Sequence, residues 1–221
     1  MNSTWWKIGT ITLLFYTVIA GFLIPVPALP ILHESIRNLY FHVPMWFGMI
    51  IILTVSLIGS IRYLGYQKEN NDILAVEAAK TGMLFGALGL VTGMCWAKYT
   101  WGAWWVNDAK LNGAAISMLT YMAYLILRNS IDEEHKRAKI AAVYNIFAYV
   151  MMLVFIMVLP RMTDSLHPGN GGNPGFGKYD LDNNMRMVFY PAVIGWTLLG
   201  VWILQLRMRI NRINSQLETE N

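Results

Sequence analysis

Long apolar stretches alternate with short polar ones along the whole 221-residue chain. Residues 8–33 and 43–61, for example, contain no Asp, Glu, Lys or Arg. A helix needs about 20 predominantly apolar residues to cross the hydrocarbon core of a bilayer, and both stretches come close to this length or exceed it. The pattern predicts six membrane-spanning helices. Their approximate bounds are 5–25, 43–61, 79–96, 112–128, 139–159 and 187–206.

The composition indicates the same class of protein. Hydrophobic residues make up 56% of the chain and charged residues only 14%, whereas a soluble domain has about 25% charged residues. The first apolar run is too long for the core of a signal peptide and has no small-residue cleavage site, so we expect it to stay as a helix. We therefore expect an all-α integral membrane protein that forms a single domain over residues 1–221.

The distribution of basic residues predicts the orientation in the membrane. Eleven of the 17 Lys and Arg residues fall on the side of the termini and of the two charged loops, and six fall on the other side. Because basic residues favour the cytoplasmic side, both termini are predicted to be cytoplasmic. The net charge of +4 implies no nucleic acid, since a basic C-terminal segment suits the anionic inner leaflet of the bilayer.

One predicted outer loop contains "TWGAWWVNDAKLN", residues 100–112. If residues 101–108 are helical, Trp101, Trp105 and Asp108 share one face, and the motif forms a short interfacial helix with a flat aromatic surface. Asp108 would then face the wet edge or cap a helix. The alternative is an interfacial belt of tryptophans that only anchors the helix ends.

Three of the four histidines are also on the predicted outer side. His42 lies where the second span begins, and His167 lies in the loop before the sixth. A single histidine at a membrane surface is usually solvated or caps a helix, and His33 and His135 keep that interpretation. Two imidazoles beside an aromatic surface, however, suit a flat apolar macrocycle with a central metal, and imidazole is a common axial ligand of haem iron. The outer basic side chains that could meet haem propionates are Arg37, Lys98, Lys110, Arg161 and Arg186.

Other chemistry has little support in the sequence. Residues 172–178 have the GxxxxGK spacing of a phosphate-binding loop, but Tyr179 replaces the Ser or Thr that binds Mg²⁺ and no strand precedes the motif. The single Cys95 cannot form an internal disulfide, and there is no CxxCH motif for covalent haem attachment. No predicted span has an ionisable residue near its middle, and no nucleophile has a base at motif spacing, so we expect no enzyme.

The segment "WGAWWVNDAKLN" resembles the tryptophan-rich WWD signature of the haem-handling proteins of cytochrome c maturation. "RNLYFHVP" and "LVTGMCWAKYTWGAWW" resemble the stretches around the first histidine and the signature in the CcmC family. The chain departs from the usual family pattern at Asn107, Lys110 and Asn112. The resemblance implies a six-helix bacterial inner-membrane protein that holds haem b at its periplasmic face, with His42 and His167 as axial ligands. It also implies that the porphyrin is supported by Trp101, Gly102, Trp104, Trp105 and Asp108.

The resemblance further implies the partners. Haem would pass to a membrane-tethered periplasmic haem chaperone, with help from an ABC-type ATPase and its permease subunit. Two other functions stay open at this point. One is a b-type electron-transfer cytochrome, in which paired histidines usually lie inside the spans. The other is a synthetase-type member of the same superfamily, which joins haem to apocytochrome and usually has more spans.

Overall fold

The computed structural model describes residues 4–167 and 181–220, and within them every regular element is helical. The predicted phosphate-loop spacing at 172–178 lies outside the described residues. In chain order the elements are α1 (Trp5–Leu23), the 3₁₀ helix η1 (His33–Asn38), α2 (Leu39–Tyr66), α3 (Glu69–Trp101), α4 (Ala109–Asn129), α5 (Glu134–Leu153), the π-helical turn η2 (Val154–Val158), α6 (Leu159–Met162) and α7 (Asn183–Glu220).

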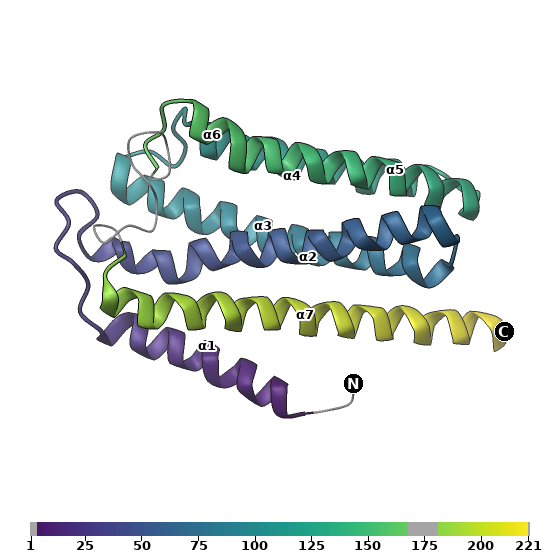
Figure 1. Cartoon of the computed structure of the whole chain (residues 1–221), viewed down its shortest axis with the longest axis horizontal. Helices are drawn as coiled ribbons and strands as arrows, with labels where there is room; N and C mark the ends of the chain where they lie inside the picture. The colour runs from purple at the N-terminus through teal and green to yellow at the C-terminus, as the bar shows by residue number, and fades with distance from the viewer. Residues whose placement is uncertain (1–3, 168–180, 221) are drawn as a thin grey trace.

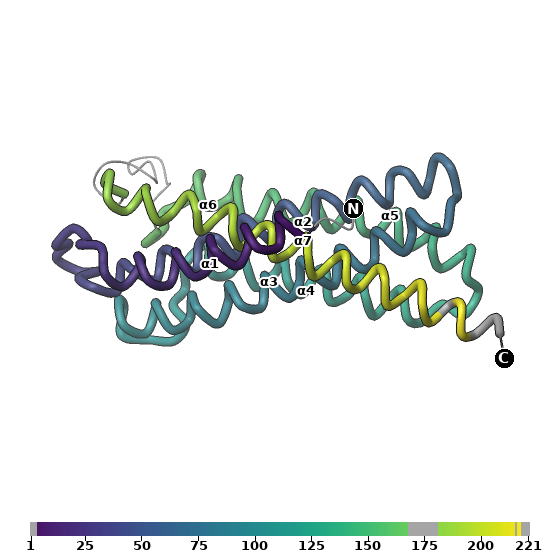
Figure 2. The backbone as a smooth tube through the Cα atoms, turned by 90° about the horizontal axis from the view of Figure 1, so that it is seen from below, coloured from purple at the N-terminus to yellow at the C-terminus, as the bar shows by residue number. Residues whose placement is uncertain are grey.

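The long helices run up and down in one elongated bundle (Figure 1). α2 and α3 lie at its centre, α4 and α5 pack on one side, and α7 and α1 pack on the other (Figures 1 and 2). Both termini point toward the end that holds the α2–α3 and α4–α5 turns, here called the terminal end. The opposite end, here called the loop end, holds η1, the chain between α3 and α4, and the chain after α6.

Five helical segments of the described residues are long and apolar enough to cross a membrane. They are Trp5–Leu23, His33–Tyr66, Glu69–Trp101, Glu134–Met162 and Asn183–Asn214. The prediction of an all-α integral membrane protein is therefore confirmed. The predicted fourth span, 112–128, falls within α4, which has 21 residues and lies alongside α5 (Figure 1). α4 is not among these five segments, so its crossing of the membrane stays a prediction.

The central helices continue well beyond their predicted apolar bounds. α3 begins at Glu69, ten residues before the predicted start of the third span. Polar side chains in this extension have partners: Arg128 forms a two-point ion pair with Asp72, at 2.7 and 2.5 Å, and Arg207 bonds Glu77 at 2.7 Å. Hydropathy reports only the apolar part of a helix, so it misses ends whose charges are paired.

A row of glycines on α3 receives large side chains from α2. The pairs, in order toward the loop end, are Gly82 with Leu53, Gly86 with Met49, Gly89 with Trp46 and Gly93 with His42. Small residues allow helices to approach closely in a membrane, where packing rather than hydrophobicity drives association. A Cβ atom at Gly93 would lie only 2.7 Å from Cε1 of His42. The glycine row thus allows the His42 imidazole to pack directly against α3.

A π-helical turn, η2, follows directly after the end of α5. Pro160 follows it closely and has no N–H to donate to the preceding turn, a frequent cause of such irregularities. Gly113, in the first turns of α4, lies so close to the Phe155 carbonyl of this turn that a Cβ would clash with it. The close approach brings the start of α4 beside residues 163–167, which leave α6.

Candidate functional site

The chain between α3 and α4, here called the tryptophan loop (residues 102–108), is not helical. α3 ends at Trp101, and Gly102 adopts a left-handed backbone with φ of 80°, which is typical of helix C-termini. Asp108 is the N-cap of α4, and its Oδ1 accepts the backbone N–H of Lys110 at 2.9 Å. The predicted short interfacial helix is therefore wrong. Gly102 ends α3 and Asp108 begins α4, and these two signals outweigh the helical spacing of the motif.

Asp108 joins the tryptophan loop to the chain after α6. Its Oδ2 accepts the Ser165 hydroxyl and the Leu166 backbone N–H, both at 2.8 Å. The residue is only 3% exposed, so the expectation that it caps a helix is confirmed and the wet-edge alternative is wrong. A buried carboxylate with these partners fixes the position of residues 165–167.

The same carboxylate orients His167. Nδ1 of His167 lies 2.9 Å from Oδ1 of Asp108, and the imidazole meets the Trp101 ring edge-on with centroids 4.9 Å apart. A carboxylate only accepts hydrogen bonds, so Nδ1 carries the proton and Nε2 keeps its lone pair. Metal-binding histidines commonly have this carboxylate partner, which fixes the tautomer and the ring orientation.

Electrostatics keep Asp108 ionised. Burial alone would raise the pKa of its carboxyl, but the hydrogen bonds from His167, the Leu166 N–H and the Ser165 hydroxyl together outweigh burial. The pKa of Asp108 therefore lies well below its ordinary value. A charged acceptor strengthens the bond from Nδ1 of His167.

His42, on α2, is oriented in a different way. Its Nδ1 lies 3.0 Å from the Gly89 carbonyl oxygen and 3.1 Å from Oγ1 of Thr92. The Thr92 hydroxyl itself donates to its own helix, so both atoms act as acceptors and Nδ1 carries the proton. Nε2 accepts the indole N–H of Trp46 at 3.3 Å. The ring also meets Trp96 edge-on, with centroids 5.7 Å apart.

The two imidazoles therefore share a chemical state and a location. His42 lies near the start of α2 and His167 follows α6, and both positions are at the loop end. His167 and Lys110 lie close enough to His42 to act on it electrostatically. Each ring is held through a protonated Nδ1, which leaves Nε2 as the coordinating atom. Such a pair can supply both axial ligands to a metal held in a flat macrocycle.

The three tryptophans of the motif have different surroundings. Trp101 packs on His167, whereas Trp104 and Trp105 are 54% and 39% exposed. The Trp105 indole donates to Oδ1 of Asn112 at 3.2 Å, and Asn112 donates to Oδ1 of Asn107 at 2.7 Å. Two of the positions that depart from the family pattern are thus bonded to each other and to a motif tryptophan.

Arg37 has structural contacts. Its Nη1 donates to the carbonyls of Gly21 and Ile24, at 2.8 and 2.7 Å, and its Nε bonds Glu34 at 2.7 Å. The guanidinium therefore caps the C-terminus of α1. A contact of Arg37 with a propionate stays a prediction.

The other predicted basic residues also lie near the loop end. Lys98 donates to the Gly102 carbonyl at 2.9 Å and so stabilises the end of α3. Arg161 donates to the Met157 carbonyl, and Arg186 lies in the first turn of α7. Lys110 is the basic residue near both His42 and Asp108, which makes it the best placed of the set to meet an anionic group.

His33 and His135 are placed differently from the pair. His33 is exposed at the start of η1 with a φ of 44°. His135 is exposed near the terminal end, where its Nδ1 lies 3.3 Å from the Tyr63 hydroxyl. Neither position resembles the oriented environments of His42 and His167.

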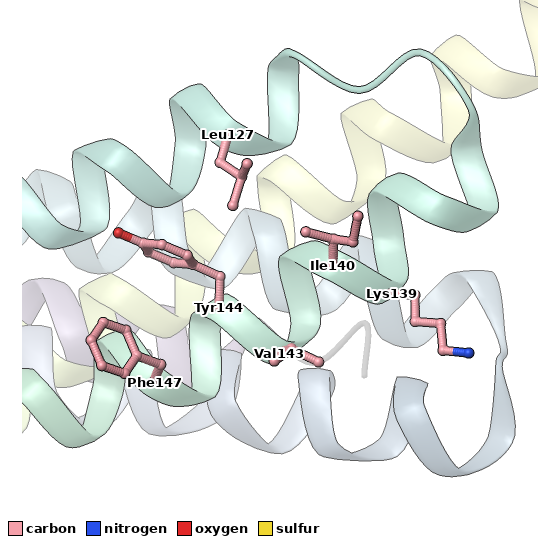
Figure 3. Close-up of a pocket in the computed structure, with 6 residues that line it drawn as sticks. All are labelled: Leu127, Lys139, Ile140, Val143, Tyr144 and Phe147. Carbon is pink, nitrogen blue, oxygen red and sulfur yellow. The ribbon is translucent and has the colours of Figure 1, made fainter.

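A pocket of about 630 Å³ lies between α4 and α5, toward the terminal end (Figure 3). Its lining residues are Leu127, Lys139, Ile140, Val143, Tyr144 and Phe147. This lining is almost entirely apolar, and the histidine pair lies at the opposite end of the bundle.

Several neighbours of the two histidines were not predicted from the sequence. Trp46 is the i+4 neighbour of His42 on α2, a spacing that could have indicated contact. Ser165 is two positions before His167, and its hydroxyl accepts the His167 backbone N–H, so it too is a local neighbour. Trp96 and Thr92 belong to α3, and no local spacing relates them to His42 on α2. They could be recognised only once the helices were packed.

These features define a class: a multi-pass, all-helical membrane protein with two oriented imidazoles and a tryptophan-rich loop at one end of its bundle. The model of the CcmC family, described as Heme exporter protein C, matches residues 2–221. The chain therefore belongs to this family, which comprises transport proteins rather than enzymes.

Curated relatives agree with this assignment. The chain is 26% identical over 178 residues to Heme exporter protein C of Escherichia coli strain K12, covering 80% of this chain and 70% of the relative. It is 27% identical over 177 residues to the Haemophilus influenzae protein of the same name, covering 80% and 71%. For the Rhodobacter capsulatus protein of that name, the values are 25% over 179 residues, 79% and 72%.

Proposed function

We propose that this protein binds haem b as its cargo at the loop end of the bundle and presents it to a haem chaperone during cytochrome c maturation. His42 and His167 are the axial ligands. The observation that carries the proposal is that Nδ1 of each imidazole lies within hydrogen-bond distance of a fixed acceptor. We infer that Nδ1 donates in both and that Nε2 keeps its lone pair. Nε2 is a nitrogen through which histidine commonly binds metals.

The surroundings of the pair fit haem chemically. Haem iron already has four ligands in the ring plane, so a protein needs to supply only two from opposite faces. The exposed rings of Trp104 and Trp105 offer apolar surface for a porphyrin edge. Lys110, near both His42 and Asp108, is the first candidate partner for a propionate.

Release of the cargo is supported by the position of the site. His42 belongs to a long helix, whereas His167 lies on non-helical chain after α6 with its side chain 23% exposed. A b-type electron-transfer cytochrome retains haem between helices inside the membrane. Ligands at the end of a bundle, one of them on a loop, suit a protein that passes its haem to a partner.

The direction of transfer follows from the charge pattern. The terminal end has the greater share of Lys and Arg, so we assign it to the cytoplasm and the loop end to the periplasm of a bacterial inner membrane. The recipient is then a membrane-tethered periplasmic chaperone. An ABC-type ATPase and its permease subunit are the expected partners on the cytoplasmic side and in the bilayer.

The test is the visible spectrum of purified variants from haem-replete cells. Wild type and His33→Ala should carry low-spin, six-coordinate haem. His42→Ala and His167→Ala should give five-coordinate or substitute-ligated iron and weaker retention. Loss of low-spin haem in the His33 variant alone would reassign the ligand. Four identical spectra would show that neither proposed histidine binds iron.

Transfer to a partner distinguishes the proposal from a b-type cytochrome. Haem loaded on the wild-type protein should leave with an added haem chaperone of the membrane-tethered type. Haem that stays on this protein and only changes oxidation state would favour the cytochrome.

A further inference from the structure

The atom of His42 that would bind iron already has a partner in this structure. The indole N–H of Trp46 donates to Nε2 of His42 at 3.3 Å. We propose that Trp46 competes with haem iron for this nitrogen and so lowers the retention of the cargo. The proposal rests on the function proposed above and concerns the regulation of the same site.

The competing bond is built into the packing of α2 and α3. Trp46 lies one helical turn after His42, and the two rings meet edge-on at 81° with centroids 6.1 Å apart. A Cβ at Gly89 would lie 2.9 Å from Cε2 of Trp46, so the indole is seated in the glycine row. The carbonyl of that same Gly89 accepts the Nδ1 proton of His42. Gly89 of α3 therefore determines the positions of both the Trp46 and the His42 rings.

The two partners of Nε2 exclude each other. An unprotonated imidazole nitrogen has one lone pair, which either accepts a hydrogen bond or coordinates iron. When iron takes Nε2, the bond from Trp46 breaks and its proton stays on the indole. The half-buried N–H is then left to find another acceptor, and this loss weakens haem binding by about three- to tenfold. On release, the bond forms again and satisfies both groups.

The chain supplies a matched control. Trp96 also meets the His42 ring edge-on, at 79° with centroids 5.7 Å apart. Its indole, however, donates to Oγ of Ser35 at 3.2 Å. Trp96→Phe therefore removes an indole N–H next to the same imidazole without changing the partner of Nε2.

The first measurement is haem loss from the full-length protein in nanodiscs. Ferric haem would be captured by excess apomyoglobin and followed in the visible spectrum, for wild type, Trp46→Phe, Trp96→Phe and His42→Ala. We expect Trp46→Phe to lose haem about three- to tenfold more slowly than wild type. Trp96→Phe should show no such slowing.

The second measurement uses the haem-free protein. With ¹⁵N-labelled histidine, the resonance of unprotonated Nε2 of His42 is assigned by its absence in His42→Ala. Loss of the hydrogen bond should shift this resonance in Trp46→Phe and not in Trp96→Phe. This readout does not depend on haem and also reports whether the variants keep the fold around His42.

The outcomes distinguish failure of the ligand assignment of His42 from failure of the competition by Trp46. A wild-type spectrum in His42→Ala would overturn the ligand assignment, and the competition with it. An altered spectrum in His42→Ala, together with wild-type or faster haem loss in Trp46→Phe, would overturn the competition alone. An unshifted Nε2 resonance in Trp46→Phe would show that the hydrogen bond is absent, with the same consequence.

Discussion

Replacing Asp108 by Asn should weaken haem retention without unfolding the protein. The carboxylate accepts bonds from the backbone N–H groups of Lys110 and Leu111, from Ser165 and Leu166, and from Nδ1 of His167. An amide has only one acceptor oxygen and no charge. Asn is as good an N-cap as Asp, so its Oδ1 can keep the cap of α4 and an uncharged, weaker bond to His167. Ser165 and Leu166, which are bonded to Oδ2, lose their acceptor.

The size of the effect follows from the loss of charge at the acceptor of His167 and from the loss of the acceptor of Ser165 and Leu166. A hydrogen bond to a charged group contributes about 1.5–3 kcal/mol, roughly twice the contribution of a neutral one. The amide group would also place a donor against the Leu166 N–H, which moves the chain that carries His167. Substitutions of the groups that orient metal-binding histidines typically lower affinity about 10- to 100-fold. We expect a loss of haem affinity in this range for Asp108→Asn.

The assay is haem titration and dissociation in nanodiscs, combined with electron paramagnetic resonance of the ferric form. A weaker Asp108–His167 bond lowers the basicity of the imidazole, so the low-spin signals should shift as well as decrease. Asp182→Asn is the matched control. Asp182 accepts the Met185 N–H at 2.8 Å at the start of α7, so the same substitution there tests the loss of a capping carboxylate alone. Equal haem affinity in wild type and Asp108→Asn would refute the orienting role.

Three further predictions concern the topology, the aromatic surface of Trp104 and Trp105, and the packing of His42 on Gly93. Reporter fusions in the tryptophan loop and at the C-terminus should report opposite sides of the membrane, and signals from the same side would contradict the assigned orientation. Trp104→Ala with Trp105→Ala should lower haem occupancy or transfer while the protein still inserts, because each ring can cover about 150–250 Å²; unchanged loading would leave these residues as an interfacial belt. Gly93→Ala should alter the haem spectrum by displacing His42, whose Cε1 would be 2.7 Å from the new Cβ. Gly65→Ala, with open space around it, should leave the spectrum unchanged. Equal spectra for both variants would mean that α3 can move away from His42 without disturbing the site.

The apolar runs predicted the membrane class and most spans correctly because bilayer thickness imposes a minimum helix length. They could not predict the helix ends. α3 extends toward Glu69 because the polar residues there have partners on other helices, such as Arg128 with Asp72. Such partners are remote in sequence, and no local pattern identifies them.

The candidate site was predicted in part. Positive-inside counting placed His42, His167 and Asp108 on one side, but nothing in the sequence paired His167 with a carboxylate 59 positions away. That pairing depends on how α4 packs on the end of α5. The error over the tryptophan loop was avoidable. Gly102 and Asp108 are the residues expected just after one helix and just before the next.

The π-helical turn at Val154–Val158 determines how α5 responds to changes in chain length. A π turn corresponds to an α-helix with one additional residue. Removing a single residue there would restore regular helix and leave the downstream chain nearly in place, whereas adding a residue to the regular helix of α5 would rotate everything downstream by about 100° and shift it by about 1.5 Å. His167 would then no longer lie on the side of the bundle that holds Asp108. Insertions in α5 should therefore be far less tolerated than a single deletion within the π turn, even where the residues around the insertion face only lipid.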